Sequence, residues 1–490
     1  MKYRIVILLV LTILTVTCTK REAVFESDIS ADYELTLILR FNGKDCLLDA
    51  EKNLLKYSLA ENEVTNFSPT VEFQNYSEVR FGSRLLDNNT TNPLGDIILH
   101  KKYEVEITTN GEVKKFKLIF TETPLIQIIS HDKIRNEPKI LARIKLNYPE
   151  IGKPTADSYV GIEIRGKSSA RLPKKSYGLR PLSDKNMGEF KSLPFFDFAK
   201  NDKWSLDAME IEKSKVRNKT SFEVWKSINP ISIESEYVEV FINNNSEGLY
   251  RFSQNYTDEL LGMGSGASLF VGIDNSKYTK FREMPDEKPL SMFWEDWEQE
   301  FPDPKQNLEW DDFYDFVKVA TSEDDQVFET QIENHLNLDK VIDYYLFVCL
   351  IYGADNAGKN WFFMKKNALS KFEILPWDLD GTWGRSASGN EQTPDRQVVN
   401  QLFERLVSVN PNQYVSKLKA RWIALRANQF SETEIINKFS ANFAEVISIS
   451  TELSKLEAEN QYTVIQNEQV YVNNWVNARL TYLDNYIRNR

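Results

Sequence analysis

The 490-residue chain has only three cysteines and contains no run of basic residues. Acidic residues outnumber basic ones by 72 to 60, and lysine and arginine gather only in short pairs. Duplex binding depends on a basic surface, so we do not expect a nucleic-acid partner. No histidine stands near another histidine or a cysteine in ligand spacing, which argues against a zinc site. These histidines are His100, His131 and His335.

No repeat of fixed period, no low-complexity tract and no Gly-x-Ser-x-Gly element of the hydrolase kind occurs in the sequence. Apolar residues are plentiful instead, since 41% of the chain is hydrophobic and 12% is aromatic. That is enough apolar material to exclude global disorder. Because a chain of this length is too long for one ordinary core, we expect about two to four domains.

The first residues have the pattern of a bacterial secretory signal. Lys2 and Arg4 precede an apolar run over residues 5–16, which is too short to span a membrane. Cys18 follows the small residue Thr17, as in a lipobox, and is the predicted lipidation site. In the alternative interpretation, Cys18 only lies near an ordinary cleavage site. Both interpretations predict export, to the cell envelope and with a lipid anchor in the first case.

We therefore assign residues 1–18 to a lipoprotein signal peptide and residues 19–30 to a polar tether. If Cys18 carries lipid, Cys46 and Cys349 are the remaining cysteines, and they fall in different predicted domains. A disulfide framework is not expected.

Residues 31–122 are predicted to form a small, immunoglobulin-like β-sandwich. Several segments alternate apolar and polar residues, as strands with one buried face do. Two such runs flank Asn110-Gly111, the dipeptide that best accommodates the positive φ angles of a tight hairpin. The other strand-like segments are Tyr33 to Phe41, Val71 to Val79 and Ile97 to Thr108.

The rest of the chain begins with strand patterns and changes to helical periodicity, which predicts an α+β domain over residues 126–430. From residue 431 to 490 apolar residues recur three and four apart, so we predict a helical C-terminal cap on that domain. The strand-like segments are Leu125 to Ser130, Ile140 to Leu146, Val160 to Arg165 and Tyr177 to Leu179.

An acidic, tryptophan-rich stretch runs from Asp286 to Asp325. Such a stretch could bind a basic or sugar-like partner. The interpretation that we favour is a solvated helix face with the tryptophans buried beneath it.

Residues 337–352 form a strongly apolar helix candidate, with Asn337 as N-cap and Gly353 placed to end it. A polar loop with Asp355 and Asn360 follows, then two short strand patterns, and then the acidic turn of residues 377–381.

Phosphoryl transfer needs a carboxylate that positions the acceptor and oxygen ligands for magnesium. Protein kinases place the base Asp five residues before a metal-binding Asn, with a second metal-binding Asp after an intervening hairpin. Asp355, Asn360 and Asp378 repeat this order, with Asp380 as a second candidate for the metal. The alternative is that these residues only cap strands and close turns.

The blocks at residues 360–365 (NWFFMK) and 372–384 (FEILPWDLDGTWG) resemble the signature of the CotH (spore coat protein H) kinase family. Residues 161–169 (GIEIRGKSS) and 173–179 (PKKSYGL) are similar to two further blocks of that family. The resemblance implies a kinase-like two-lobed domain that uses ATP with Mg²⁺ or Mn²⁺. The His-Arg that precedes the base in common kinases is replaced here by Gly353-Ala354.

The nucleotide contacts are expected from the first strands of this domain. Lys174 or Lys175 could reach the phosphates as a point charge, with Arg165 and the amides around Ser168 and Ser169 beside them. A surface lysine pair is the alternative. Kinase analogy places Gln254 at the hinge beside adenine, where the family would have an acidic residue.

The sequence thus predicts an exported, membrane-anchored kinase that transfers the γ-phosphate of ATP to Ser or Thr hydroxyls of an unidentified protein substrate. Two rivals stay open. One is a kinase-like surface lipoprotein without activity that binds a protein or glycan. The other keeps the chemistry but uses a glycan hydroxyl or water as acceptor.

Overall fold

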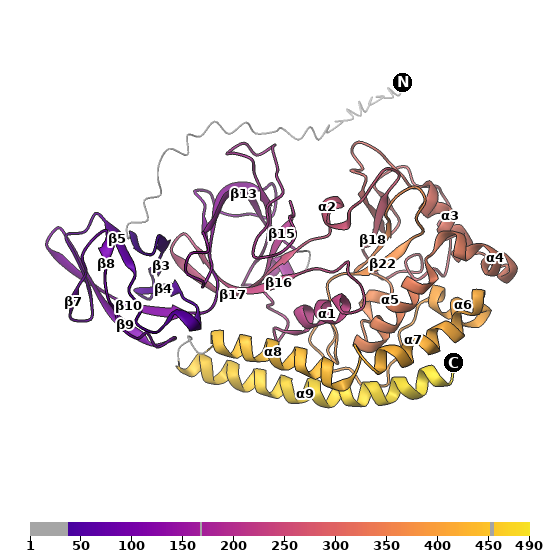
Figure 1. Ribbon diagram of the computed structural model, residues 1–490. Coiled ribbons are helices and arrows are strands. Elements are labelled where there is room, and N and C mark those ends of the chain that lie inside the picture. Colours follow the sequence, from indigo (N-terminus) through magenta and orange to yellow (C-terminus); the bar gives the residue numbers. More distant parts are fainter. Residues whose placement is uncertain (1–37, 167–168, 451–454) are drawn as a thin grey trace, which may run out of the picture. The chain divides into compact units, whose positions relative to one another are not determined.

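A computed structural model describes residues 38–166, 169–450 and 455–490 of the chain (Figure 1). The predicted signal peptide and tether, with Cys18, lie outside the described residues, and so does Ser168. Strands dominate the first half of the described chain and helices the second, which confirms the α+β class and the helical C-terminal segment. Within these ranges, no helix is both long and apolar enough to cross a membrane.

Residues 38–121 form two sheets that share one apolar core. The strands are β1 Ile38–Phe41, β2 Lys44–Asp45, β3 Leu47–Asp49, β4 Leu54–Ser58, β5 Thr70–Gln74, β6 Glu78–Phe81, β7 Arg84–Leu85, β8 Thr90–Thr91, β9 Lys102–Thr109 and β10 Glu112–Thr121. One sheet has the order β2-β1-β5-β8 and the other the order β3-β4-β10-β9-β6-β7. Aromatic rings from both sheets, including Phe41, Tyr57 and Phe120, meet in the core.

The hairpin predicted at Asn110-Gly111 is confirmed. Both residues have positive φ, 50° and 82°, and Thr109 pairs with Glu112 across the turn. The run predicted as one strand from Val71 to Val79 is wrong in its continuity, because Asn75 at φ 65° separates β5 from β6. The alternation of side chains could not show this break, since both strands present apolar residues to the same core.

Seven strands form a closed barrel in the order β11-β12-β13-β14-β15-β17-β16. They are β11 Leu125–Ile129, β12 Ile140–Asn147, β13 Ala156–Arg165, β14 Ser176–Pro181, β15 Trp204–Asp207, β16 Ser235–Ile242 and β17 Asn245–Gln254. A parallel pairing of β11 with β16 closes the barrel. Interior residues such as Ile144, Trp204 and Phe252 are fully buried. The helix α1 (Arg217–Lys226) follows β15 in the chain.

A buried ion pair joins the barrel to the strands that precede it. Lys56 Nζ on β4 lies 2.6 Å from Glu239 Oε2 on β16, and both side chains are less than a tenth exposed. Lys44 adds hydrogen bonds from its Nζ to the carbonyls of Ser58 and Tyr148. The ion pair and the Lys44 hydrogen bonds therefore hold the two β regions together, and the charged groups that form them are shielded from solvent.

We expect Lys56→Met to lower the free energy of unfolding by about 3 kcal/mol, because it leaves the buried Glu239 carboxylate without this cation. The double variant Lys56→Met/Glu239→Leu should recover most of that loss. Urea unfolding followed by tryptophan fluorescence measures both. Equal stability of the single variant and the unaltered chain would contradict the assignment.

A five-stranded sheet and most of the helices make up the rest. The strands are β18 Ser268–Gly272, β19 Phe293–Trp294, β20 Trp297–Phe301, β21 Trp361–Lys365 and β22 Glu373–Pro376, in the order β19-β20-β18-β21-β22. The helices are α2 Asp258–Leu261, α3 Asp311–Ala320, α4 Asp325–His335, α5 Leu338–Ile351, α6 Gln401–Val409, α7 Tyr414–Arg426, α8 Glu432–Ser450 and α9 Lys455–Arg488. In Figure 1, α8 and α9 lie side by side beneath α1, α5 and α7.

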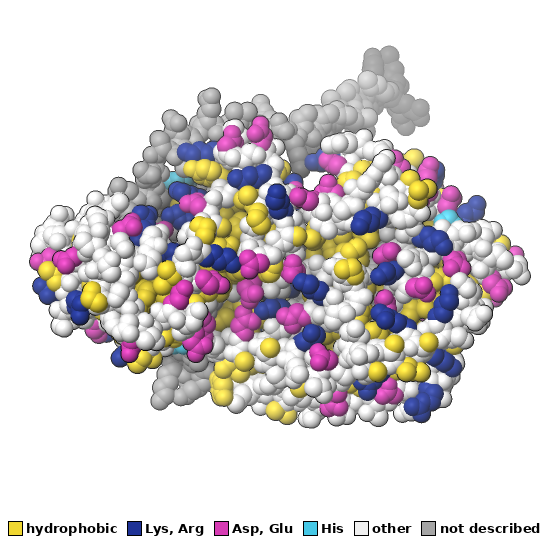
Figure 2. Space-filling view, in the orientation of Figure 1, with side chains coloured by type: hydrophobic (Ala, Val, Ile, Leu, Met, Phe, Trp, Pro, Cys, Tyr) yellow, Lys and Arg dark blue, Asp and Glu magenta, His cyan; other side chains and the backbone are white. Residues whose placement is uncertain are grey.

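The acidic, tryptophan-rich stretch is only partly as expected. Trp294, Trp297 and Trp310 are buried, as predicted. The stretch is not one helix face, however, because β19, β20 and loops precede α3. Figure 2 shows acidic and basic side chains interspersed over the face drawn, so the charge of −12 is not gathered in one patch of that face. Cys46 and Cys349 are buried and free.

Candidate functional site

The helix α5 ends at the loop that carries the predicted catalytic residues. Asn337 caps its start as predicted, since the side chain accepts a hydrogen bond from the Lys340 amide. The residue that ends it is Tyr352, with a left-handed φ of 49°, and not Gly353. Gly353 serves another purpose, because a Cβ there would stand 2.7 Å from Oδ1 of Asn356. The glycine thus leaves room for the Asn356 side chain.

Asn356 joins this loop to the acidic turn. Its side-chain Nδ2 donates to the carbonyl of Asn360 at 2.9 Å and to the carbonyl of Trp377 at 2.7 Å. The residue is 1% exposed, and Tyr344 donates from its hydroxyl to the Asn356 carbonyl. A buried amide with both donors used fixes the two backbones against each other.

The hairpin of β21 and β22 brings the same two segments together from the other side. Trp361 pairs with Pro376, and the Trp377 amide donates to the Asn360 carbonyl at 2.9 Å. Asn360 and Asp378 both have left-handed backbones, with φ of 55° and 52°. Asn and Asp tolerate this conformation better than most residues, because their short polar side chains can form hydrogen bonds locally.

The acidic turn holds two carboxylates that lack full compensation. Asp378 keeps exposed surface and Asp380 is half-buried, but protein atoms surround both carboxyl groups and reduce their contact with water. This desolvation, followed by the charge of Asp207, raises the pKa of Asp378. Burial and the charge of Asp378 raise the pKa of Asp380 well above its usual range. Both carboxyl groups are therefore harder to ionise than a carboxyl group in water.

The barrel places basic groups opposite this turn. Burial lowers the pKa of Arg165, while the charges of Asp207 and Asp378 oppose that shift, and its guanidinium lies 5.8 Å from the Trp377 ring centre. Arg251 on β17 pairs with Asp207 at 3.0 Å. Burial works against ionisation of Asp207, but Arg251, the Met209 amide and Arg165 together outweigh it and hold the pKa of Asp207 below its usual value. Charges from strand ends of the barrel thus face the acidic turn.

Asp355 lies at the start of a short 3₁₀ turn, η3 (Asp355–Ala357), and its carboxylate is about one-third exposed. Lys359 Nζ lies 3.2 Å from Asp355 Oδ2. The charge of Lys359 also opposes the rise in the pKa of Asp378. The structure therefore brings Asp355, Asn360 and the acidic turn into one connected block.

The donor set fits a divalent cation only in part. In the described chain, no group of three His, Cys, Asp or Glu could hold a metal by itself. Two carboxylates with raised pKa values and a neighbouring Asn supply hard oxygen atoms, which suit Mg²⁺ when phosphate oxygens and water complete the octahedron. The residues present fit Mg²⁺ bound together with a nucleotide better than a bare ion.

Three of the predicted nucleotide-binding residues bind backbone groups through their side chains, and a fourth begins a turn. Lys174 Nζ donates to the Leu249 carbonyl and lies 4.3 Å from the Tyr250 ring centre. Lys175 Nζ donates to the carbonyls of Ala170 and Leu172. Gln254 is fully buried, and its amide accepts from the Glu234 backbone and donates to the Ala199 carbonyl. Ser169 begins the 3₁₀ turn η2 (Ser169–Arg171), directly after the undescribed Ser168.

Sequence reasoning missed Asn356, Asp207 and Arg251. Asn356 stands between two residues that were singled out, but a buried amide cannot be told from a turn residue by type alone. Asp207 follows the Trp-Ser-Leu run of β15, and its position at a strand end that faces Asp378 depends on the barrel.

A loop with Asp355 and Asn360 precedes the acidic turn in the chain, in the order that protein kinases use for their base and metal ligands. The family model described as CotH kinase protein matches residues 162–483, more than half of the chain. The chain belongs to this family. It is also similar to inner spore coat protein H of Bacillus subtilis (strain 168), with 22% identity over 285 residues, which cover 56% of this chain and 72% of the relative.

Replacement of Asp380 by Asn should stabilise the metal-free protein. A carboxyl whose pKa is raised by folding stabilises the fold when it is protonated and loses that contribution as pH rises through the folded pKa. At pH 8 we expect Asp380→Asn to raise Tm by about 1–3 °C in EDTA. The gain should vanish as pH falls towards 4, and scanning calorimetry measures it. A lower Tm for the variant at pH 8 would show that the charge is compensated.

Proposed function

We propose that this chain is an exported atypical protein kinase that transfers the γ-phosphate of ATP to a Ser or Thr hydroxyl of a protein. The observation that carries the proposal is the Asn356 amide, which ties the loop of Asp355 and Asn360 to the acidic turn. Membership of the CotH kinase family supports it. In this proposal the barrel and the helical region are the two lobes, and the nucleotide binds between them.

Asp355 is the proposed base. Its carboxylate is accessible, and the amides of Gly358 and Lys359 donate to its carbonyl, which fixes the residue at the loop tip. From there it accepts the proton of the acceptor hydroxyl and orients that oxygen. The ammonium group of Lys359 keeps a compensating charge beside the carboxylate.

Asn360 and Asp378 are the proposed metal ligands, with Asp380 as a third oxygen donor. Bound Mg²⁺ or Mn²⁺ with ATP would supply the phosphoryl group and neutralise charge on its oxygens. Arg165, at the end of β13, is close enough for its charge to interact with that of Asp378, and it is the proposed phosphate contact from the barrel. The contacts of Lys174 and Lys175 leave them a structural role in this proposal.

Export and anchoring through Cys18 remain part of the proposal. The amino-terminal pattern of Lys2, Arg4 and an apolar run supports them. The Bacillus relative is named as an inner spore coat protein. Extracytoplasmic action would require a source of nucleotide there.

The test is incubation of the purified chain with γ-labelled ATP, Mg²⁺ or Mn²⁺ and a Ser/Thr-containing acceptor protein. We expect Asp355→Asn to lower kcat by about 10²- to 10⁴-fold, because proton transfer is lost while ATP binding persists. Asp378→Asn should instead abolish the metal-dependent binding of ATP. Asp339→Asn, at an exposed site on α5, is the matched control and should keep full activity.

Phosphoserine or phosphothreonine in the acceptor, found by mass spectrometry, would identify the product. Transfer to a glycan or release of free phosphate would change the acceptor but not the site. Absence of both ATP binding and transfer in the unaltered chain would refute the proposed function.

A further inference from the structure

The helix α9 packs against the segment that follows the acidic turn, residues 384–396, called here the post-turn segment. Tyr471 donates from its hydroxyl to the Gly384 carbonyl at 2.7 Å, and Trp475 donates from Nε1 to the Gln392 carbonyl at 2.8 Å. Gly384 has a φ of 88°, and a Cβ there would stand 2.7 Å from the Trp475 ring. Only glycine fits this close approach.

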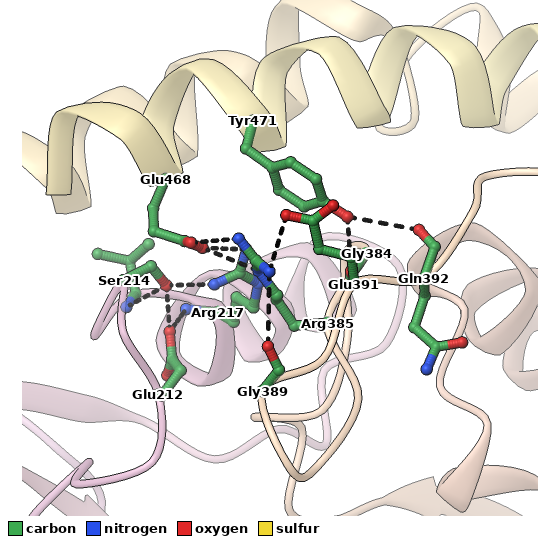
Figure 3. Close-up of polar contacts among 11 residues, drawn as sticks. Glu212, Ser214, Arg217, Gly384, Arg385, Gly389, Glu391, Gln392, Glu468 and Tyr471 are labelled. Carbon is green, nitrogen blue, oxygen red and sulfur yellow. Dashed lines mark hydrogen bonds and ion pairs between the residues drawn. The ribbon is translucent and has the colours of Figure 1, made fainter. Parts of the chain in front are cut away.

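Glu468 on α9 forms the charged part of the same contact (Figure 3). Its carboxylate lies 2.8 Å from Nη2 of Arg217 and 2.5 Å from Nη2 of Arg385. The side chains of Glu468 and Arg217 are 5% and 1% exposed, and that of Arg385 is 14% exposed. One buried carboxylate therefore joins α9, the start of α1 and the post-turn segment.

Arg385 extends this contact through the post-turn segment. Its Nη1 atom lies 3.2 Å from Glu391 Oε1 and donates to the Gly389 carbonyl at 3.5 Å. The guanidinium thus closes the loop of residues 385–391 on itself (Figure 3). This loop begins four residues after Gly381, the end of the acidic turn.

The paired arginines also reach the candidate site. Arg217, Arg385 and Asp380 line one small pocket together with Glu212. Glu212 accepts from the Arg217 amide at 2.7 Å, and its charge acts on Asp380. Any shift of either arginine therefore changes the surroundings of the acidic turn.

Charge balance depends on Glu468. Two guanidinium groups share its carboxylate, and removal of that charge would leave two buried cations with reduced compensation. In many kinases, arginines beside the corresponding segment receive their negative charge from a phosphorylated residue. Here a carboxylate from α9 supplies negative charge to Arg217 and Arg385.

We propose that Glu468 is a positioning residue, which holds the post-turn segment through Arg385 and thereby fixes the acidic turn for phosphoryl transfer without prior phosphorylation. This inference rests on the proposed kinase function. It adds α9 to the parts that the reaction requires, although Glu468 itself contacts neither substrate nor nucleotide.

The main variant is Glu468→Gln in the purified chain. We expect kcat to fall about 10- to 100-fold, with a smaller change in KM for ATP, because a displaced turn holds the nucleotide but misplaces the reacting groups. Hydrogen exchange of the amides of residues 378–396 should become faster. Phosphatase treatment of the unaltered chain should leave kcat unchanged.

A control on the same helix separates positioning from general stability. Asp484 accepts from Trp422 Nε1 at 2.9 Å and pairs with Arg426 at 3.0 Å, so it anchors α9 to α7 away from the site. Asp484→Asn should lower Tm but keep kcat and the exchange rates of residues 378–396. Arg385→Gln is the second variant, because it frees the post-turn segment while Glu468 stays paired with Arg217.

Unchanged exchange in residues 378–396 of both Glu468→Gln and Arg385→Gln would overturn the inference, whatever the activity. Unchanged kcat in an active protein would overturn it too. If the unaltered chain transfers no phosphate, the proposed kinase function fails separately. Faster exchange in both variants but not in Asp484→Asn would then still support Glu468 as the residue that holds the turn.

Discussion

Both donor hydrogens of the Asn356 amide are used inside the protein, one on the Asn360 carbonyl and one on the Trp377 carbonyl. The candidate site depends on these two bonds, because they set the distance between the loop after α5 and the turn after β22. An acid at this position could not donate them, and a shorter side chain could not reach. Gly353, which makes room for the amide, and Tyr344, which donates to its backbone, serve the same contact.

The acidic groups near the Asn356 hydrogen bonds lower the stability of the fold, but they suit the binding of a cation. Asp378 and Asp380 repel each other and Asp207, while the arginines that compensate them belong to other elements. In the proposed function, bound Mg²⁺ would supply positive charge to this cluster, and the metal-free fold would be less stable without it. The closed barrel and the apolar core under α5 provide the stability that makes this tolerable.

Local patterns predicted the elements that are determined locally. The hairpin at Asn110-Gly111, the helix capped by Asn337 and the strand pair after Asn360 were all readable from residue type and spacing. The order of Asp355, Asn360 and Asp378 was also readable. Barrel closure was not, because β11 meets β16 by a parallel pairing of segments far apart in the chain. For the same reason the sequence could not show that the Gln254 amide forms hydrogen bonds with backbone groups. Nor could it show that Arg217 pairs with Glu468.

The distance in sequence between these partners also orders their appearance during synthesis. Glu468 follows Arg385 by 83 residues and Arg217 by 251. At about 5–20 residues per second, a ribosome adds Glu468 roughly 4–17 s after Arg385. A growing chain therefore contains every acidic residue of the turn well before the helix that holds the next segment in place. During translation, the acidic residues are therefore synthesised several seconds before the helix that completes the contacts around them.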